Sequence, residues 1–109
     1  MSDGAPAGDA ADAFAKRARA AHGESIRRLV AFGAAVRGDD RGVHTEVEVL
    51  LVLESDESTV ERDLERLAET VGLEHSVVVS LHVLPADRFE SNAEHPFVRT
   101  ALEEGRAYV

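Results

Sequence analysis

The stretch that decides the fold is Leu29–Leu53, with the sequence LVAFGAAVRGDDRGVHTEVEVLLVL. It begins with a short apolar segment that ends in Phe32 and Gly33, and a loop rich in glycine and aspartate follows. The loop leads into an apolar run from Thr45 to Leu53. Because glycine and aspartate favour turns, we expect two strands, Ser25–Phe32 and Thr45–Leu53, joined by this loop. The apolar spacing in Ser25–Phe32 would also fit a helix.

The residue pattern of Thr45–Leu53 predicts a strand that is buried within a sheet. Successive side chains of a strand point to opposite faces. One face carries Val47, Val49, Leu51 and Leu53, and the other carries Glu46, Glu48, Leu50 and Val52. Both faces are apolar from Val49 onward, so we expect the strand to be covered on both sides. Glu46 and Glu48 then stand side by side at the head of a buried strand, where a sheet can present two carboxylates to a ligand.

Composition limits the class of protein. A chain of 109 residues is enough for one domain, and 44% hydrophobic residues can build an ordinary core. The absence of cysteine excludes disulfides, cysteine–zinc sites and thiol nucleophiles. The net charge of −9 argues against general affinity for duplex nucleic acid. Lys16 is the only lysine, and many carboxylates with arginine in place of lysine indicate a salt-adapted, halophilic host.

The location is expected to be cytoplasmic. No apolar run approaches the length that spans a membrane, so we expect no membrane association. The first residues carry acids and no apolar segment, which is unlike a secretory signal.

The N-terminal part predicts a tail and a helix. Residues 1–9 contain Gly4, Pro6 and Gly8 among alanine and aspartate, and we expect them to be disordered. Residues 10–21 are rich in alanine, with Phe14, Ala18 and Ala21 on one side, and predict a helix that Gly23 ends.

The C-terminal half predicts two longer helices and two further strands. A capping box, Ser58 with Glu61, predicts a helix with Val60, Leu64, Leu67 and Val71 on one face and Gly72 as its end. Residues 76–84 read as a strand, 86–91 as a short helical turn, and 106–109 as a short last strand. A helix begins at Pro96, carries the stripe Phe97, Val98, Ala101 and Leu102, and ends at Gly105. The prediction is one α+β domain over residues 10–109, with a small mixed sheet flanked by helices.

Two segments together resemble a known family. Phe32-Gly33-Ala34-Ala35-Val36-Arg37-Gly38, followed by Glu46-Val47-Glu48-Val49-Leu50-Leu51-Val52, resembles the minimal nucleotidyltransferases of the DNA-polymerase-β superfamily. That family has a strand ending in Phe-Gly-Ser, then Arg-Gly, then Asp-x-Asp opening an apolar strand. The ending Pro96–Tyr108 is similar to the closing helix and strand of the family. The resemblance covers residues 25–109 and indicates a divergent member of archaeal, halophilic type.

The resemblance implies a nucleotide site. By position, Gly33 and Ala34 would hold the phosphates, with Arg37 and Gly38 in the supporting loop. Glu46 and Glu48 would be the catalytic acids that bind Mg²⁺, because paired carboxylates supply the hard oxygens that this ion requires. A third acid from a later strand completes a two-metal site in such enzymes. The reaction implied is transfer of a nucleoside monophosphate from a nucleoside triphosphate to a hydroxyl of a protein, with a small helical protein as the partner of an antitoxin-type domain.

Three departures from the family pattern predict a degenerate site. Ala34 replaces the family serine, and Glu46 and Glu48 replace two aspartates, which lengthens each side chain by one methylene. Displacements of about 1 Å can cost roughly 10²-fold in a positioned site. The strand over residues 76–84 carries no acid, only Ser80 and His82, while Glu74 precedes it and Asp87 follows it. The alternative is therefore a catalytically inactive module that binds a partner protein or a second copy of the chain.

Plainer interpretations of the same residues remain open. Glu46 and Glu48 could be the polar start of a strand on a very acidic surface, Gly33 a turn glycine, and Arg37 a solvated charge. The histidines have no metal-ligand spacing, and His82 is expected to be a partly buried packing residue. A chance match within an unrelated α+β regulatory domain is the third hypothesis.

Overall fold

The centre of the fold is a four-stranded mixed sheet with strand order β3-β2-β1-β4. The computed structural model describes residues 6–32, 46–55 and 57–109. Strands β1 (Ile26–Phe32) and β2 (Glu46–Leu53) pair antiparallel. Strand β3 (Val78–Pro85) runs parallel to β2, and the short β4 (Arg106–Ala107) pairs antiparallel with β1. The predicted class, a small α+β domain with a mixed sheet flanked by helices, is confirmed.

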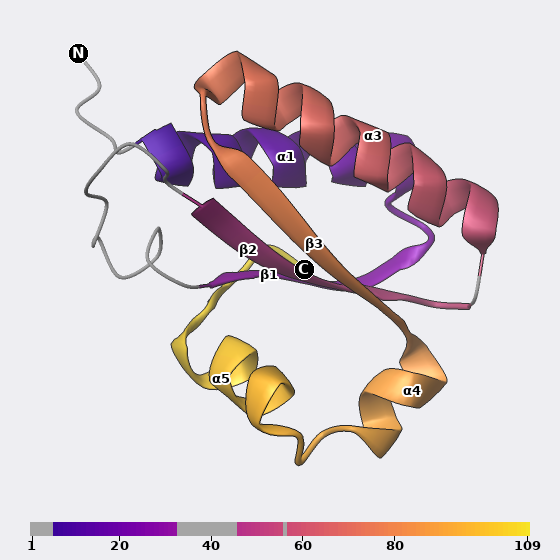
Figure 1. Ribbon diagram of the computed structural model, residues 1–109. Helices are drawn as coiled ribbons and strands as arrows, with labels where there is room; N and C mark the ends of the chain where they lie inside the picture. The colour runs from indigo at the N-terminus through magenta and orange to yellow at the C-terminus, as the bar shows by residue number, and fades with distance from the viewer. Residues whose placement is uncertain (1–5, 33–45, 56) are drawn as a thin grey trace.

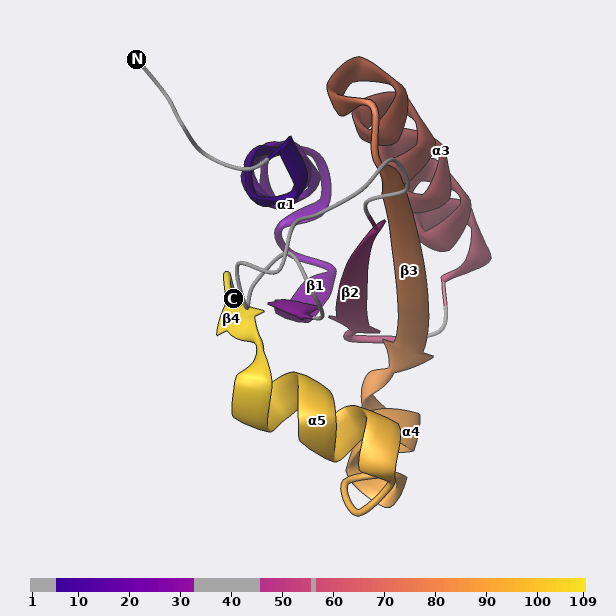
Figure 2. The same cartoon turned by 60° about the vertical axis from the view of Figure 1, so that its left-hand side comes forward.

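Helices cover the sheet on both faces (Figure 1). Helices α1 (Pro6–His22) and α3 (Ser58–His75) lie side by side on one face. The short helix α4 (Ala86–Ser91) and helix α5 (Pro96–Glu104) lie on the other, as the turned view in Figure 2 also shows. None of the helices in the described ranges is both long enough and apolar enough to cross a bilayer.

Strand β2 is the most deeply buried element. Its apolar side chains are between 0 and 2% exposed. One set packs into the core under α1 and α3, and the other packs into the core against α4 and α5. The first set is Val47, Val49, Leu51 and Leu53, and the second is Leu50 and Val52. The predicted assignment of the two faces is therefore confirmed.

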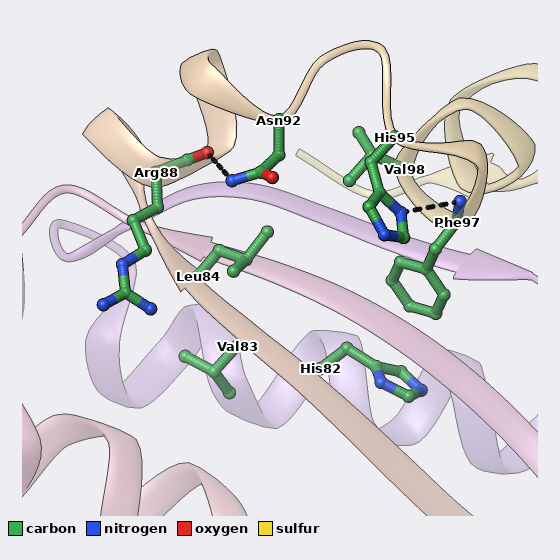
Figure 3. A pocket seen from close by; sticks show the side chains of 8 residues that line it. All are labelled: His82, Val83, Leu84, Arg88, Asn92, His95, Phe97 and Val98. Atoms are coloured by element: carbon green, nitrogen blue, oxygen red, sulfur yellow. Dashed lines mark hydrogen bonds between the residues drawn. The ribbon is translucent and has the colours of Figure 1, made fainter.

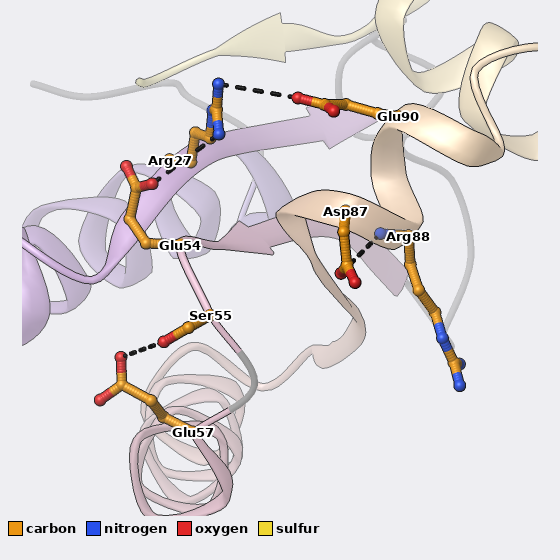
Figure 4. Close-up of polar contacts among 7 residues, drawn as sticks. All are labelled: Arg27, Glu54, Ser55, Glu57, Asp87, Arg88 and Glu90. Atoms are coloured by element: carbon orange, nitrogen blue, oxygen red, sulfur yellow. Dashed lines mark hydrogen bonds and ion pairs between the residues drawn. The ribbon is translucent and has the colours of Figure 1, made fainter.

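A bulge at Arg27 explains why β1 carries two exposed arginines in succession. Ile26 pairs with Leu53 and Arg28 with Val52, so β1 has one extra residue between them. Arg27 lies 3.8 Å from carboxylate oxygens of both Glu54 and Glu90 (Figure 4). The Arg28 guanidinium lies 5.5 Å from the centre of the Phe89 ring. The Glu90 pair and the Arg28–Phe89 contact join β1 to α4, but half-exposed ion pairs of this kind contribute little stability.

The predicted start of the first helix is wrong by four residues. We expected disorder up to residue 9, whereas α1 begins at Pro6. Proline is favoured in the first turn of a helix, and Ala10 and Ala11 are buried in the core, so the alanine-rich segment is packed earlier than predicted. Phe14 and Ala18 are buried as expected, but Ala21 is exposed.

The predicted boundaries of α3 are also wrong. The capping box is absent, because Ser58 is already helical and the N-cap is Glu57, which makes no side-chain cap bond. The helix continues through Gly72 to His75, and Ser76 ends it in the left-handed conformation (φ 58°). The helix face predicted from the apolar spacing is confirmed, with Leu64 and Val71 buried.

Gly72 has a packing role in place of the predicted stop. A Cβ atom at this position would lie 2.6 Å from the carbonyl oxygen of Val77. The chain that leads into β3 therefore passes directly against the helix backbone, and only glycine leaves room for it.

The C-terminal segment closes the sheet beside β1. Pro96 stands at the start of α5, as predicted. In the apolar stripe of this helix, Val98 and Ala101 are buried, whereas Leu102 is 41% exposed. Beyond β4, the Tyr108 hydroxyl donates a hydrogen bond to the Asp12 carboxylate of α1. Burial and this hydrogen bond raise the pKa of Tyr108 above its ordinary value.

We predict that Gly72→Ala destabilises the domain by about 1–3 kcal/mol, because the new methyl group overlaps the backbone leading into β3. Gly8→Ala is the matched control, since a Cβ at Gly8 of α1 meets nothing within 4 Å. That change should raise stability by roughly 0.5–1 kcal/mol through helix propensity. Urea unfolding of both variants measures the difference, and equal effects of the two changes would contradict the packing role of Gly72.

Candidate active site at the head of β2

The acid pair lies at one end of the sheet, on the face that carries α4 and α5. Glu46 and Glu48 open β2, in phase with Leu50 and Val52, which pack against those helices. Glu46 is exposed, and the Glu48 side chain is 36% exposed. Because the next residue is fully buried Val49, the backbone that carries the acids is held firmly while their oxygens reach solvent.

The end of β1 lies directly beside this pair. Phe32, the last residue of β1, is the cross-strand partner of Glu48. The chain therefore leaves β1 next to the second carboxylate. Gly33, Ala34, Arg37 and Gly38, the residues to which the resemblance assigns phosphate contacts, lie outside the described residues.

Strand β3 supplies a serine to Glu46. Glu46 is in register with Val78, and Glu48 with Ser80. The Ser80 hydroxyl donates a hydrogen bond of 2.6 Å to Oε2 of Glu46. Sequence reasoning missed this contact because it depends on the parallel register of β2 and β3, which residue types alone do not define.

His82 is the second contribution of β3. Its Nε2 lies 3.6 Å from Oε1 of Glu48, which is too long for a hydrogen bond but close for a charge pair when the imidazole is protonated. The ring contacts Phe32 and Phe97 at centroid distances of 6.1 and 4.5 Å, and the two phenylalanine rings also contact each other at 5.2 Å. The Nε2 atom is buried without a hydrogen-bond partner in the described part of the chain, although the side chain is 37% exposed. The expected packing role of His82 is confirmed, and its place beside Glu48 is an addition.

The two acids that flank β3 cannot complete the site. Glu74 of α3 forms an ion pair with Arg17 of α1 at 2.9 Å, on the opposite face of the sheet. Asp87 follows the C-terminal end of β3, whereas the acid pair stands beside the start of β3, and its carboxylate accepts from the backbone N–H of Arg88 (Figure 4). Within residues 6–32, 46–55 and 57–109, no three aspartate, glutamate or histidine side chains are placed to hold a metal ion.

The residues present fit one Mg²⁺ ion better than two. Glu46 and Glu48 are separated by one residue on the same face of a strand, so their carboxylates can approach one ion. Mg²⁺ is commonly held by one or two carboxylates, with water and substrate phosphates as its other ligands. A second ion would need another carboxylate. At this end of the sheet β3 offers only the Ser80 hydroxyl and the His82 imidazole, so the described residues favour one ion.

Comparison of the chain with protein-family models, curated proteins and solved structures finds no match.

We predict that Ser80→Asp creates a three-carboxylate site. The Ser80 hydroxyl already reaches Glu46 at 2.6 Å, so an aspartate there would converge with both glutamates. Repulsion among the carboxylates should lower the melting temperature without metal, and millimolar Mg²⁺ should restore it. Ser80→Asn, with the same shape and no charge, should show no restoration by Mg²⁺. Calorimetric melting curves with and without Mg²⁺ measure this, and identical behaviour of both variants would contradict the assigned geometry.

Proposed function

We propose that the chain is a nucleotidyltransferase-like domain with a degenerate site. It binds a nucleoside triphosphate together with one Mg²⁺ ion at Glu46 and Glu48. It transfers the nucleoside monophosphate to a protein hydroxyl slowly, acting on a small helical partner in the manner of an antitoxin.

The observation that carries this proposal is the pairing of Phe32 with Glu48. The resemblance divides the site between a loop after a first strand and two acids opening a second strand. The register of β1 and β2 supports this division, because it sets Phe32, the last residue of β1, beside Glu48 at one end of the sheet.

The expected rate is low because the site lacks groups that the reaction uses. In the transfer, the acceptor oxygen forms a bond to the α-phosphorus, the bond from that phosphorus to pyrophosphate breaks, and the proton of the acceptor hydroxyl passes to solvent. Glu46 and Glu48 would hold the ion that neutralises charge on the phosphates. In enzymes of the resembled family a third acid from a later strand completes a two-metal site. Here the β3 side chains that face the acid pair are Ser80 and His82, and neither is an acid.

A second candidate function, a protein-binding module, is favoured by the outer edge of β3. Among the described residues β3 pairs only with β2, and residues 76–85 carry no charged side chain apart from His82. Val78 is 57% exposed and Leu73 of the preceding helix is 79% exposed. An uncharged, unpaired strand edge is suited to pairing with another chain, either a partner protein or a second copy.

We predict that Glu46→Gln with Glu48→Gln abolishes Mg²⁺-dependent binding of ATP or GTP, because the substituted amides cannot replace two anionic ligands. The triple change Ala34→Ser, Glu46→Asp and Glu48→Asp restores the family pattern and should tighten binding by about tenfold or more. Calorimetric titration in concentrated salt, where diffuse binding to the acidic surface is screened, measures both. Absence of binding by the natural chain and the triple variant would exclude the nucleotide site and leave the protein-binding module.

A further inference from the structure

A cavity of about 570 Å³ lies between β3, α4 and the start of α5 (Figure 3). Its volume is within the range of about 300–1,000 Å³ that is usual for small-molecule sites. Leu84, Phe97 and Val98 form apolar walls, and Arg88, Asn92 and His95 are polar residues around it. His82 also lines the cavity.

His82 connects this cavity to the acid pair. Its ring is 4.5 Å from the Phe97 ring, and its Nε2 is 3.6 Å from Glu48. A ligand whose anionic end is held through a Mg²⁺ ion at Glu46 and Glu48 could therefore extend past one side chain into the cavity. Nucleotides have this form, with phosphates at one end and a flat heteroaromatic base at the other.

Asn92 presents a free hydrogen-bond acceptor to the cavity. Its Nδ2 donates a bond of 2.8 Å to the carbonyl oxygen of Arg88. A carbonyl can only accept, so this bond fixes the orientation of the amide and leaves Oδ1 available. No partner of Oδ1 is found among the described residues.

His95 presents a donor that has no partner among the residues the structure describes. Its Nδ1 accepts the backbone N–H of Phe97 at 3.1 Å, so the neutral imidazole carries its proton on Nε2. In Figure 3 this nitrogen and the Asn92 oxygen both lie between Arg88 at one end of the cavity and Phe97 at the other. The cavity therefore combines one acceptor, one donor and aromatic walls.

We infer that this cavity takes the heteroaromatic base of the nucleotide, a role that rests on the proposed function. Nucleobases carry neighbouring N–H donors and ring-nitrogen or carbonyl acceptors on one edge, which matches Asn92 Oδ1 and His95 Nε2–H. Phe97 and His82 supply aromatic surface for the ring, and base–aromatic contacts stabilise binding whatever the base. Arg88 adds a cation at the opposite wall.

The test separates the base site from the phosphate site by using each half of the ligand alone. Adenosine, guanosine, cytidine and uridine are titrated one at a time, at millimolar concentration, into the full ¹⁵N-labelled chain. Mg²⁺ with tripolyphosphate is titrated in a parallel experiment, and ribose is the control. We expect at least one nucleoside to shift the amide signals of His82, Asn92, His95 and Phe97, and tripolyphosphate to shift those of Glu46 and Glu48.

His95→Asn removes the donor while keeping the helix cap. Asparagine at the N-cap accepts the same backbone N–H, so α5 should stay folded, but its short amide cannot replace Nε2–H in the cavity. The variant should weaken nucleoside binding by about tenfold and leave tripolyphosphate binding unchanged. The double Glu46→Gln, Glu48→Gln variant should show the reverse.

Two results would overturn the base site: no nucleoside shifts the cavity residues more than ribose does, or His95→Asn binds nucleosides as tightly as the natural chain. If nucleosides bind but tripolyphosphate does not, the phosphate assignment fails and the cavity stands as a separate site for heteroaromatic ligands.

Discussion

Burial of β2 on both faces is the constraint on which the other elements depend. Its six apolar side chains are almost completely removed from solvent, and each contributes about 1.5–3 kcal/mol. Their sum is comparable with the whole stability of a small domain. Exposing either apolar face of β2 to solvent would unfold the domain. Helices α1 and α3 are therefore required on one face of the sheet, and α4 and α5 on the other.

This constraint also positions the polar residues. A strand buried along most of its length can be polar only where it emerges, and β2 emerges at Glu46 and Glu48. Because β1 and β3 pair with β2 in fixed register, the end of β1 at Phe32 and the polar residues Ser80 and His82 of β3 lie at the same end of the sheet as the acid pair. Helix α5 adds Phe97 against His82. The candidate site therefore follows from the pairing of β2 with its neighbours.

The sequence predicted the order of elements and the faces of β2 because alternation and apolar spacing are local properties. It failed where a tertiary contact decides. Gly72 resembles a helix stop, but the close approach of the Val77 backbone explains it. Ser58 resembles an N-cap, whereas it is the first helical residue and Glu57 is the N-cap. The acids were identified from their spacing in β2. Their contacts with Ser80 and His82 could not be predicted, because neither strand's own sequence determines the register between β2 and β3.

The most direct test is paramagnetic broadening of amide signals by Mn²⁺, which prefers the same oxygen ligands as Mg²⁺. The ¹⁵N-labelled chain would be titrated with Mn²⁺ in concentrated salt, so that diffuse attraction to the acidic surface is screened. A metal site at the head of β2 predicts that broadening starts at Glu46, Glu48 and Ser80, and that it disappears in the Glu46→Gln, Glu48→Gln variant. Broadening spread evenly over the acidic helices, and unchanged in the variant, would contradict it.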